Sequence, residues 1–92
     1  MPLSRKVNFK NMLKNRNLLQ VPNVIRWEFK MEKDQALKVT VNVVGLFSNT
    51  ETFLTKMRKD GRITVPKLIQ ALLKRDKPSP EGYIMDVTLE PT

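Results

Sequence analysis

The strongest constraint on the fold is an internal repeat. Residues 17–29 (NLLQVPNVIRWEF) and 61–73 (GRITVPKLIQALL) share one order of features: a short alternating segment, a valine followed by proline, and then apolar residues at helical spacing. An ungapped offset of 44 residues aligns identical residues: Phe9 with Phe53, Val21 with Val65, Pro22 with Pro66, Ile25 with Ile69, Lys30 with Lys74, Lys33 with Lys77 and Val43 with Val87. We therefore predict two copies of one unit, at about residues 5–45 and 49–90 of a single domain spanning 1–92.

Each unit is predicted to run strand, strand, helix, strand. Alternating apolar residues mark the first strand of each copy, namely Val7, Phe9 and Leu13, then Phe53 and Met57. A tight turn follows. Asp60-Gly61 favours a hairpin because both positions accept positive φ at low cost. Asn15-Arg16-Asn17 is a weaker turn signal in the first copy, since asparagine tolerates the left-handed conformation better than most residues.

The second strands are short and lead directly into helices. Leu19 and Val21 face the core in the first copy, and Ile63 and Val65 in the second. Pro22 and Pro66 suit the first helical position, where a missing N–H costs nothing. One apolar stripe is predicted on each helix, formed by Val24, Ile25 and Phe29, and by Leu68, Ile69, Leu72 and Leu73. Trp27 is expected to be partly buried beside its stripe.

The third strands show the clearest alternation. Inward positions are predicted for Leu37, Val39, Val41 and Val43, and for Tyr83, Met85, Val87 and Leu89. Residues 45–50 form the predicted connector between the units, and 78–82 form a loop. Since one unit cannot bury both faces of its strands, we expect a mainly β fold with two short helices, in which two ββαβ repeats interleave into a closed six-stranded barrel with pseudo-twofold symmetry.

Charge and composition limit the possible functions. The chain carries 17 Lys and Arg against nine Asp and Glu, a net charge of +8, so a polyanion is the natural partner. It has no cysteine and no histidine, which excludes thiolate and imidazole catalysis and the usual zinc sites. The aspartates Asp34, Asp60, Asp76 and Asp86 fall on different elements. No catalysis, metal or cofactor is therefore expected, and without a long apolar run we expect a cytoplasmic protein that does not enter membranes.

The turn and helix of the second unit resemble a known family. Residues 58–72 (RKDGRITVPKLIQAL) are similar to the AbrB/SpoVT swapped-hairpin domains, through Arg58, Asp60, Gly61, Arg62, Ile63, Val65, Pro66, Ile69 and Leu72. Members of that family are homodimeric DNA-binding transcription factors in which two chains build one barrel. Their subunits have four strands and about half this length, whereas this chain holds two three-stranded units covalently.

The whole chain, from Val7 to Leu89, is more similar to the RIFT barrels, single-chain relatives within the cradle-loop barrels that include small duplicated archaeal proteins. That resemblance implies a monomeric pseudo-dimer. RIFT barrels occur in DNA-binding relatives, in CTP-dependent riboflavin kinases and in translation factors, so the fold alone does not select a function.

Two functions are compatible with these features. The first is nucleic-acid binding, most simply of DNA, through basic hairpin tips and adjoining strand faces, with Arg58 and Arg62 as the positions that match the family; the candidate residues are Arg58, Arg62, Lys59, Lys14, Arg16, Lys10 and Lys56. The second is a small-ligand or vestigial enzyme barrel related to the riboflavin kinases, which the absence of a glycine-rich phosphate loop disfavours. A protein-interaction scaffold is the remaining alternative.

Overall fold

The computed structural model describes residues 5–32, 34–44, 50–73 and 81–92, and it is mainly β with two helices, as predicted. The elements follow the order β1 (Val7–Met12), a 3₁₀ turn η1 (Asn15–Asn17), β2 (Leu18–Gln20), α1 (Asn23–Glu28), β3 (Ala36–Val43), β4 (Glu51–Lys56), β5 (Arg62–Thr64), α2 (Lys67–Leu73) and β6 (Ile84–Pro91). Most of the predicted 45–50 connector and the lysines 33, 74 and 77 lie outside the described residues.

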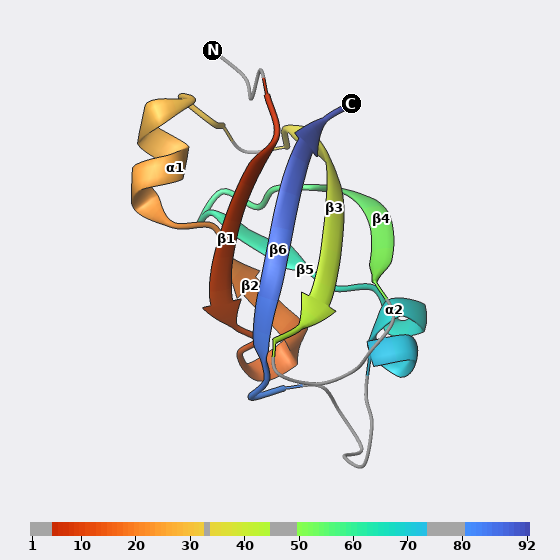
Figure 1. The fold of residues 1–92 in the computed structure, drawn as a ribbon. Helices are drawn as coiled ribbons and strands as arrows, with labels where there is room; N and C mark the ends of the chain where they lie inside the picture. The colour runs from red at the N-terminus through yellow and green to blue at the C-terminus, as the bar shows by residue number, and fades with distance from the viewer. Residues whose placement is uncertain (1–4, 33, 45–49, 74–80) are drawn as a thin grey trace.

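The strands form two antiparallel sheets. Four strands pair in the order β1-β6-β3-β4, while β2 pairs only with β5. Figure 1 shows the larger sheet in front, β2 and β5 crossing behind it, and the two helices on opposite sides. Within the described ranges these pairs do not make the continuous ring that a closed barrel requires. The predicted closure is therefore not confirmed.

Strand register relates the two halves by an approximate twofold rotation. Leu19 pairs with Ile63, its equivalent at offset 44, and β1 and β4 have the same sequence of buried and exposed positions. The third strands depart from this offset. Phe9 lies opposite Val87 and its equivalent Phe53 lies opposite Val39, so β3 and β6 correspond at 87 − 39 = 48 residues.

The ungapped alignment is therefore wrong for the third strands. From the end of β2 (Gln20) to the start of β3 (Ala36) is 36 − 20 = 16 residues, whereas from the end of β5 (Thr64) to the start of β6 (Ile84) is 84 − 64 = 20. The second unit thus holds four additional residues before its third strand, and the identity of Val43 with Val87 does not reflect equivalent positions. Because four is an even number, the alternation of inward and outward side chains is unaffected.

One hydrophobic core lies between the two sheets and the helices. The inward positions predicted for the strands are buried except Val7 and Tyr83, which are partly buried. Twelve side chains are almost completely inaccessible: Leu13, Leu19, Leu37, Ile63, Leu73, Met85, Leu89, Val21, Val39, Val41, Val65 and Val87. Tyr83 is half-buried and packs against this core. The period-two pattern is confirmed in the strands other than β2, where the consecutive residues Leu18 and Leu19 are both buried.

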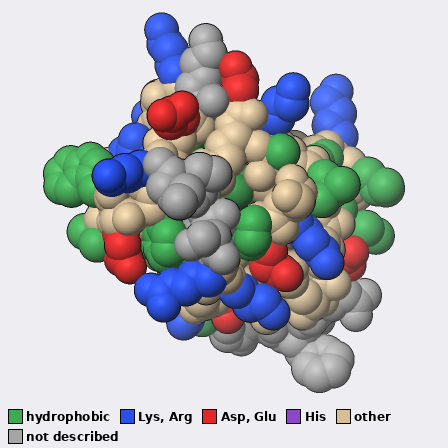
Figure 2. Space-filling view, turned by 90° about the horizontal axis from the view of Figure 1, so that it is seen from above, with side chains coloured by type: hydrophobic (Ala, Val, Ile, Leu, Met, Phe, Trp, Pro, Cys, Tyr) green, Lys and Arg blue, Asp and Glu red, His purple; other side chains and the backbone are tan. Residues whose placement is uncertain are grey.

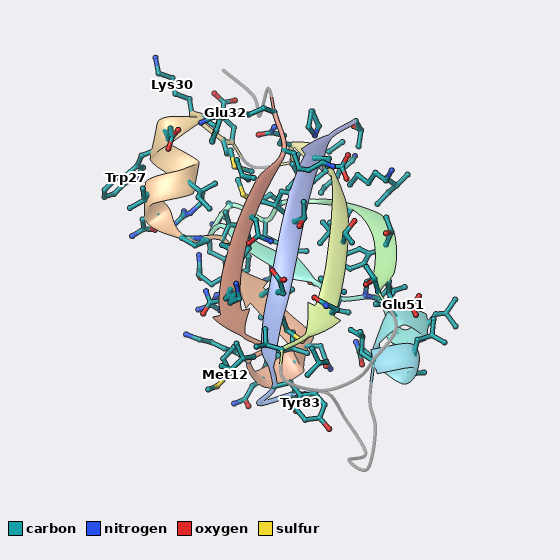
Figure 3. The ribbon with its side chains drawn as sticks, viewed as in Figure 1. Met12, Trp27, Lys30, Glu32, Glu51 and Tyr83 are labelled. Carbon is teal, nitrogen blue, oxygen red and sulfur yellow. The ribbon has the colours of Figure 1, made fainter. Side chains whose placement is uncertain are left out.

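The apolar helix stripes are narrower than predicted. Only Ile25 and Phe29 from the α1 region, and Ile69 and Leu73 on α2, turn toward the core. Val24 and Leu68 are 68% and 71% exposed, Leu72 is 48% exposed, and Trp27 is 73% exposed rather than partly buried. Helices of six and seven residues bury one pair of side chains at i and i+4, and neighbouring apolar positions then face outward. Trp27 points away from the sheets in Figure 3.

Each helix begins one residue later than predicted. Pro22 is the N-cap of α1 and its carbonyl accepts the N–H of Arg26, while α2 begins at Lys67, directly after Pro66. A side chain from the next turn binds the carbonyl before each proline. Arg26 Nε donates to Val21 O at 3.1 Å, and its equivalent Gln70 donates through Nε2 to Val65 O at 2.7 Å.

Neither helix approaches the length of a membrane span, and no other described segment supplies a helix that could cross one.

Candidate functional site

The two hairpin turns that carry the predicted basic residues have matching backbone geometry. We call residues 14–17 tip one and residues 58–61 tip two. In tip one, Lys14 N donates to Leu18 O at 3.0 Å, and in tip two Arg58 N donates to Arg62 O at 2.9 Å. Each tip is also held by the other half of the chain, because Val65 N donates to Asn17 O and Val21 N donates to Gly61 O. The tips are therefore fixed relative to the β2–β5 pair.

Tip one places non-glycine residues in the left-handed region. Asn17 has a φ of 57°, as the tolerance of asparagine predicts, and it corresponds to Gly61, whose φ is 79°. Arg16 also has a positive φ, 65°, which no sequence signal indicated. The side-chain Oδ1 of Asn17 is buried and accepts no hydrogen bond from the described residues. Tip one is thus the more strained of the two turns.

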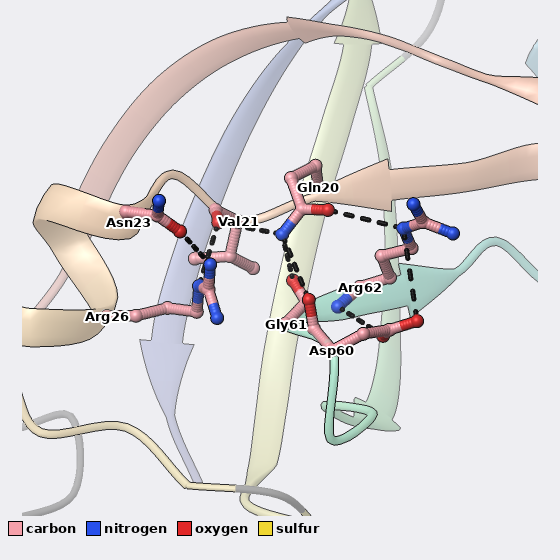
Figure 4. A network of polar contacts seen from close by, with 7 residues as sticks. All are labelled: Gln20, Val21, Asn23, Arg26, Asp60, Gly61 and Arg62. Atoms are coloured by element: carbon pink, nitrogen blue, oxygen red, sulfur yellow. Dashed lines mark hydrogen bonds and ion pairs between the residues drawn. The ribbon is translucent and has the colours of Figure 1, made fainter.

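Tip two is joined to the start of α1 by a polar network (Figure 4). Gln20 Nε2 donates to the carbonyls of Asp60 at 3.2 Å and Gly61 at 3.3 Å, and Gln20 Oε1 accepts from Arg62 Nε at 3.2 Å. The Arg62 N–H donates to Asp60 Oδ1 at 3.2 Å. Arg62, predicted as a nucleic-acid contact, therefore also stabilises the turn that presents its neighbours.

Gly61 is favoured in tip two mainly by its backbone conformation, since its φ is 79°. A Cβ at this position would lie 2.6 Å from the guanidinium of Arg26, which also donates to Asn23 Oδ1. We expect Gly61→Ala to lower the free energy of unfolding by about 1–2 kcal/mol in urea denaturation, because alanine resists positive φ and displaces Arg26. The matched change Asn17→Gly should instead raise stability, since it relieves φ and removes a buried acceptor. Equal effects of the two changes would contradict this account.

The β2–β5 pair separates the two tips rather than bringing them together. Leu18 lies opposite Thr64 and Gln20 lies opposite Arg62, so tip one and tip two extend from opposite ends of the pair. Counting along the ladder from Arg16 to Asp60 gives about six steps of about 3.3 Å, or about 20 Å.

The exposed cations Lys14, Arg16, Arg58 and Lys59 form no ion pair with any residue in the described ranges. Arg62 Nε lies 3.9 Å from the Asp60 carboxylate.

The two remaining predicted residues lie elsewhere. Lys10 and Lys56 are on the outer face of the four-stranded sheet, Lys10 opposite Asp86 and Lys56 opposite Ala36. On the same face Lys38 lies opposite Glu90. Acidic residues beside two of these three lysines weaken the positive potential of this face. Basic and acidic side chains are also interspersed on the face that Figure 2 shows. Lys10 is therefore not grouped with the tips, whereas Lys56 ends β4 two residues before Arg58 of tip two.

A pocket of about 480 Å³ lies beside tip one. Its lining combines apolar side chains with two predicted cations, Lys14 and Arg62, and with Gln20 and Glu81. Sequence reasoning missed the contributions of Gln20, Arg26 and Glu81. For Arg26 the sequence did contain a signal. The offset of 44 residues aligns it with Gln70, so both helices carry a long polar side chain at the same position.

Comparisons of the chain with protein-family models, with curated proteins and with solved structures give no match. The resemblance to swapped-hairpin domains and RIFT barrels therefore stays a prediction.

Proposed function

We propose that this protein binds the phosphate backbone of a nucleic acid along its β2–β5 side, without catalysis. The observation that carries the proposal is the placement of four exposed cations without ion-pair partners among the described residues, two at each end of one short strand pair: Lys14, Arg16, Arg58 and Lys59. Arg and Lys in such positions neutralise phosphates and release the counterions condensed on them.

The spacing of the tips supports contact with several phosphates at once. In a duplex the phosphates of one strand follow one another at about 3.4 Å along the helix axis, so the estimated 20 Å between tips corresponds to about six base pairs. Both tips are tied to the opposite half of the chain by backbone hydrogen bonds of 2.9–3.0 Å. Cations held on such turns lose little conformational freedom of the backbone on binding, which favours affinity.

We further propose that the two sheets close into one barrel of the predicted kind. Asn11 Nδ2 on β1 donates to Gln20 O on β2 at 2.9 Å, and the tip-two turn joins β4 to β5. These contacts support closure at both sides of the β2–β5 pair. In the closed form both tips extend from one continuous sheet. The edge strands β1 and β4 would then not be available to pair with strands of other chains.

Binding should depend steeply on salt. If the four tip cations each neutralise one phosphate, log K against log [salt] should have a slope of about −2.8 for a single strand and about −3.6 for a duplex, from factors of about 0.7 and 0.9 per contact. Fluorescence anisotropy of a labelled oligonucleotide, titrated at several salt concentrations, measures this slope. A dissociation constant above about 10⁻⁴ M at low salt, weaker than ordinary non-specific binding, would overturn the proposal.

A further inference from the structure

The pocket beside tip one has a floor and a rim of different chemistry. Met12 and Leu18 supply accessible apolar surface, and the cations Lys14 and Arg62 also line the pocket. Met12 is 45% exposed and supplies most of this surface, because Leu18 is nearly buried and Leu13 is fully buried. In Figure 3, Met12 lies at the end of β1 that is close to tip one. At about 480 Å³ the pocket falls within the range of about 300–1,000 Å³ that is usual for small organic groups.

The backbone around the pocket is firmly held. Leu13 N donates to Tyr83 O at 2.9 Å, and Leu13 O accepts from Gly82 N at 2.8 Å. On the other wall, Asn17 N donates to Lys14 O at 3.0 Å and lies 3.3 Å from Glu81 Oε2. The floor therefore exists before any ligand arrives, so little ordering is needed on binding.

We propose that this pocket holds one unpaired base of a single-stranded nucleic acid, an inference that rests on the proposed function. A base presents a flat apolar face to the accessible surface of Met12 and Leu18, and its own and adjoining phosphates reach the Lys14 and Arg62 side chains at the rim. A base in a duplex is stacked on both sides and cannot enter. The pocket also lies between tip one and Arg62, beside the path that a strand spanning both tips would follow.

The test compares an intact oligonucleotide of about ten residues with an all-abasic strand of the same phosphate number, which retains backbone contacts and loses the base. The full chain should bind the intact strand about tenfold more tightly. An intact-to-abasic ratio near one would overturn the base pocket while leaving the phosphate-binding function standing. Failure to bind either strand would overturn both.

Three variants test whether the base lies in this pocket. Met12→Asp adds a carboxylate to the floor at a position exposed enough to tolerate it, and the ratio should fall to about one. Leu54→Asp introduces the same charge on β4 at a side chain 71% exposed, outside the pocket, and should leave the ratio at about ten. If the intact-to-abasic ratio stays near ten in Met12→Asp but falls in Trp27→Ala, the base contacts the exposed tryptophan and the proposal is overturned. Thermal unfolding of each variant confirms that it is folded.

Discussion

Neutralising the four cations of the two tips should weaken nucleic-acid binding by about 100-fold at low salt and flatten the salt dependence by about three units of slope. The variant carries glutamine at Lys14, Arg16, Arg58 and Lys59. The reason is that these side chains have no acidic partner among the described residues, so their charge is available to phosphates. Anisotropy titrations of the variant and the parent at matched salt concentrations measure both quantities.

The control removes the same number of charges from other surfaces. It carries glutamine at Lys10, Lys30, Lys38 and Lys67. Two of these lie on the outer face of the four-stranded sheet, Lys30 follows α1 and Lys67 begins α2, and all four are exposed. We expect a loss of only a few fold and an almost unchanged slope. If both variants lost affinity equally, net charge alone would govern binding and the tips would have no special role.

Leu19→Ala should cause the largest loss of stability. Leu19 and Ile63 are both fully buried and lie opposite each other at the centre of the β2–β5 pair. Truncation leaves a cavity in the core and should cost about 3 kcal/mol, which in a domain of this size lowers Tm by about 12–24 °C. Urea denaturation and a thermal scan followed by circular dichroism give the two values.

Leu54→Ala is the matched comparison, since the same side chain is removed from a position that is 71% exposed. Its effect should stay within about 0.5 kcal/mol, as expected for a surface substitution. Similar losses at Leu19 and Leu54 would show that the β2–β5 pair does not cover the core as described.

The alternation of apolar residues was sufficient to predict the strands and their inward faces. The strands of the larger sheet have one face toward a single interior, so a period of two identifies Leu37 or Val87 without knowledge of the partner strand. The repeat offset correctly matched β1 with β4 and β2 with β5. It failed for β3 and β6, because sequence identity at Val43 and Val87 cannot show how many residues a loop adds before the strand.

Helix faces and the candidate site were predicted less completely. A six-residue helix has too few turns for periodicity to separate a wide stripe from a single i, i+4 pair, so Val24 and Trp27 were placed inside although they are exposed. The basic turns were found from their charge. Their separation across β2–β5, the network around Gln20 and the pocket beside tip one all depend on contacts between halves that are 44 residues apart.

The most direct test of the binding surface is a ¹H–¹⁵N spectrum of the labelled full chain, recorded during titration with an unlabelled single-stranded oligonucleotide. The account predicts that the largest shift changes appear together at tip one and tip two, with smaller changes along β2 and β5. Changes concentrated on the outer face of the four-stranded sheet, around Lys10 and Lys38, or confined to one tip, would contradict it.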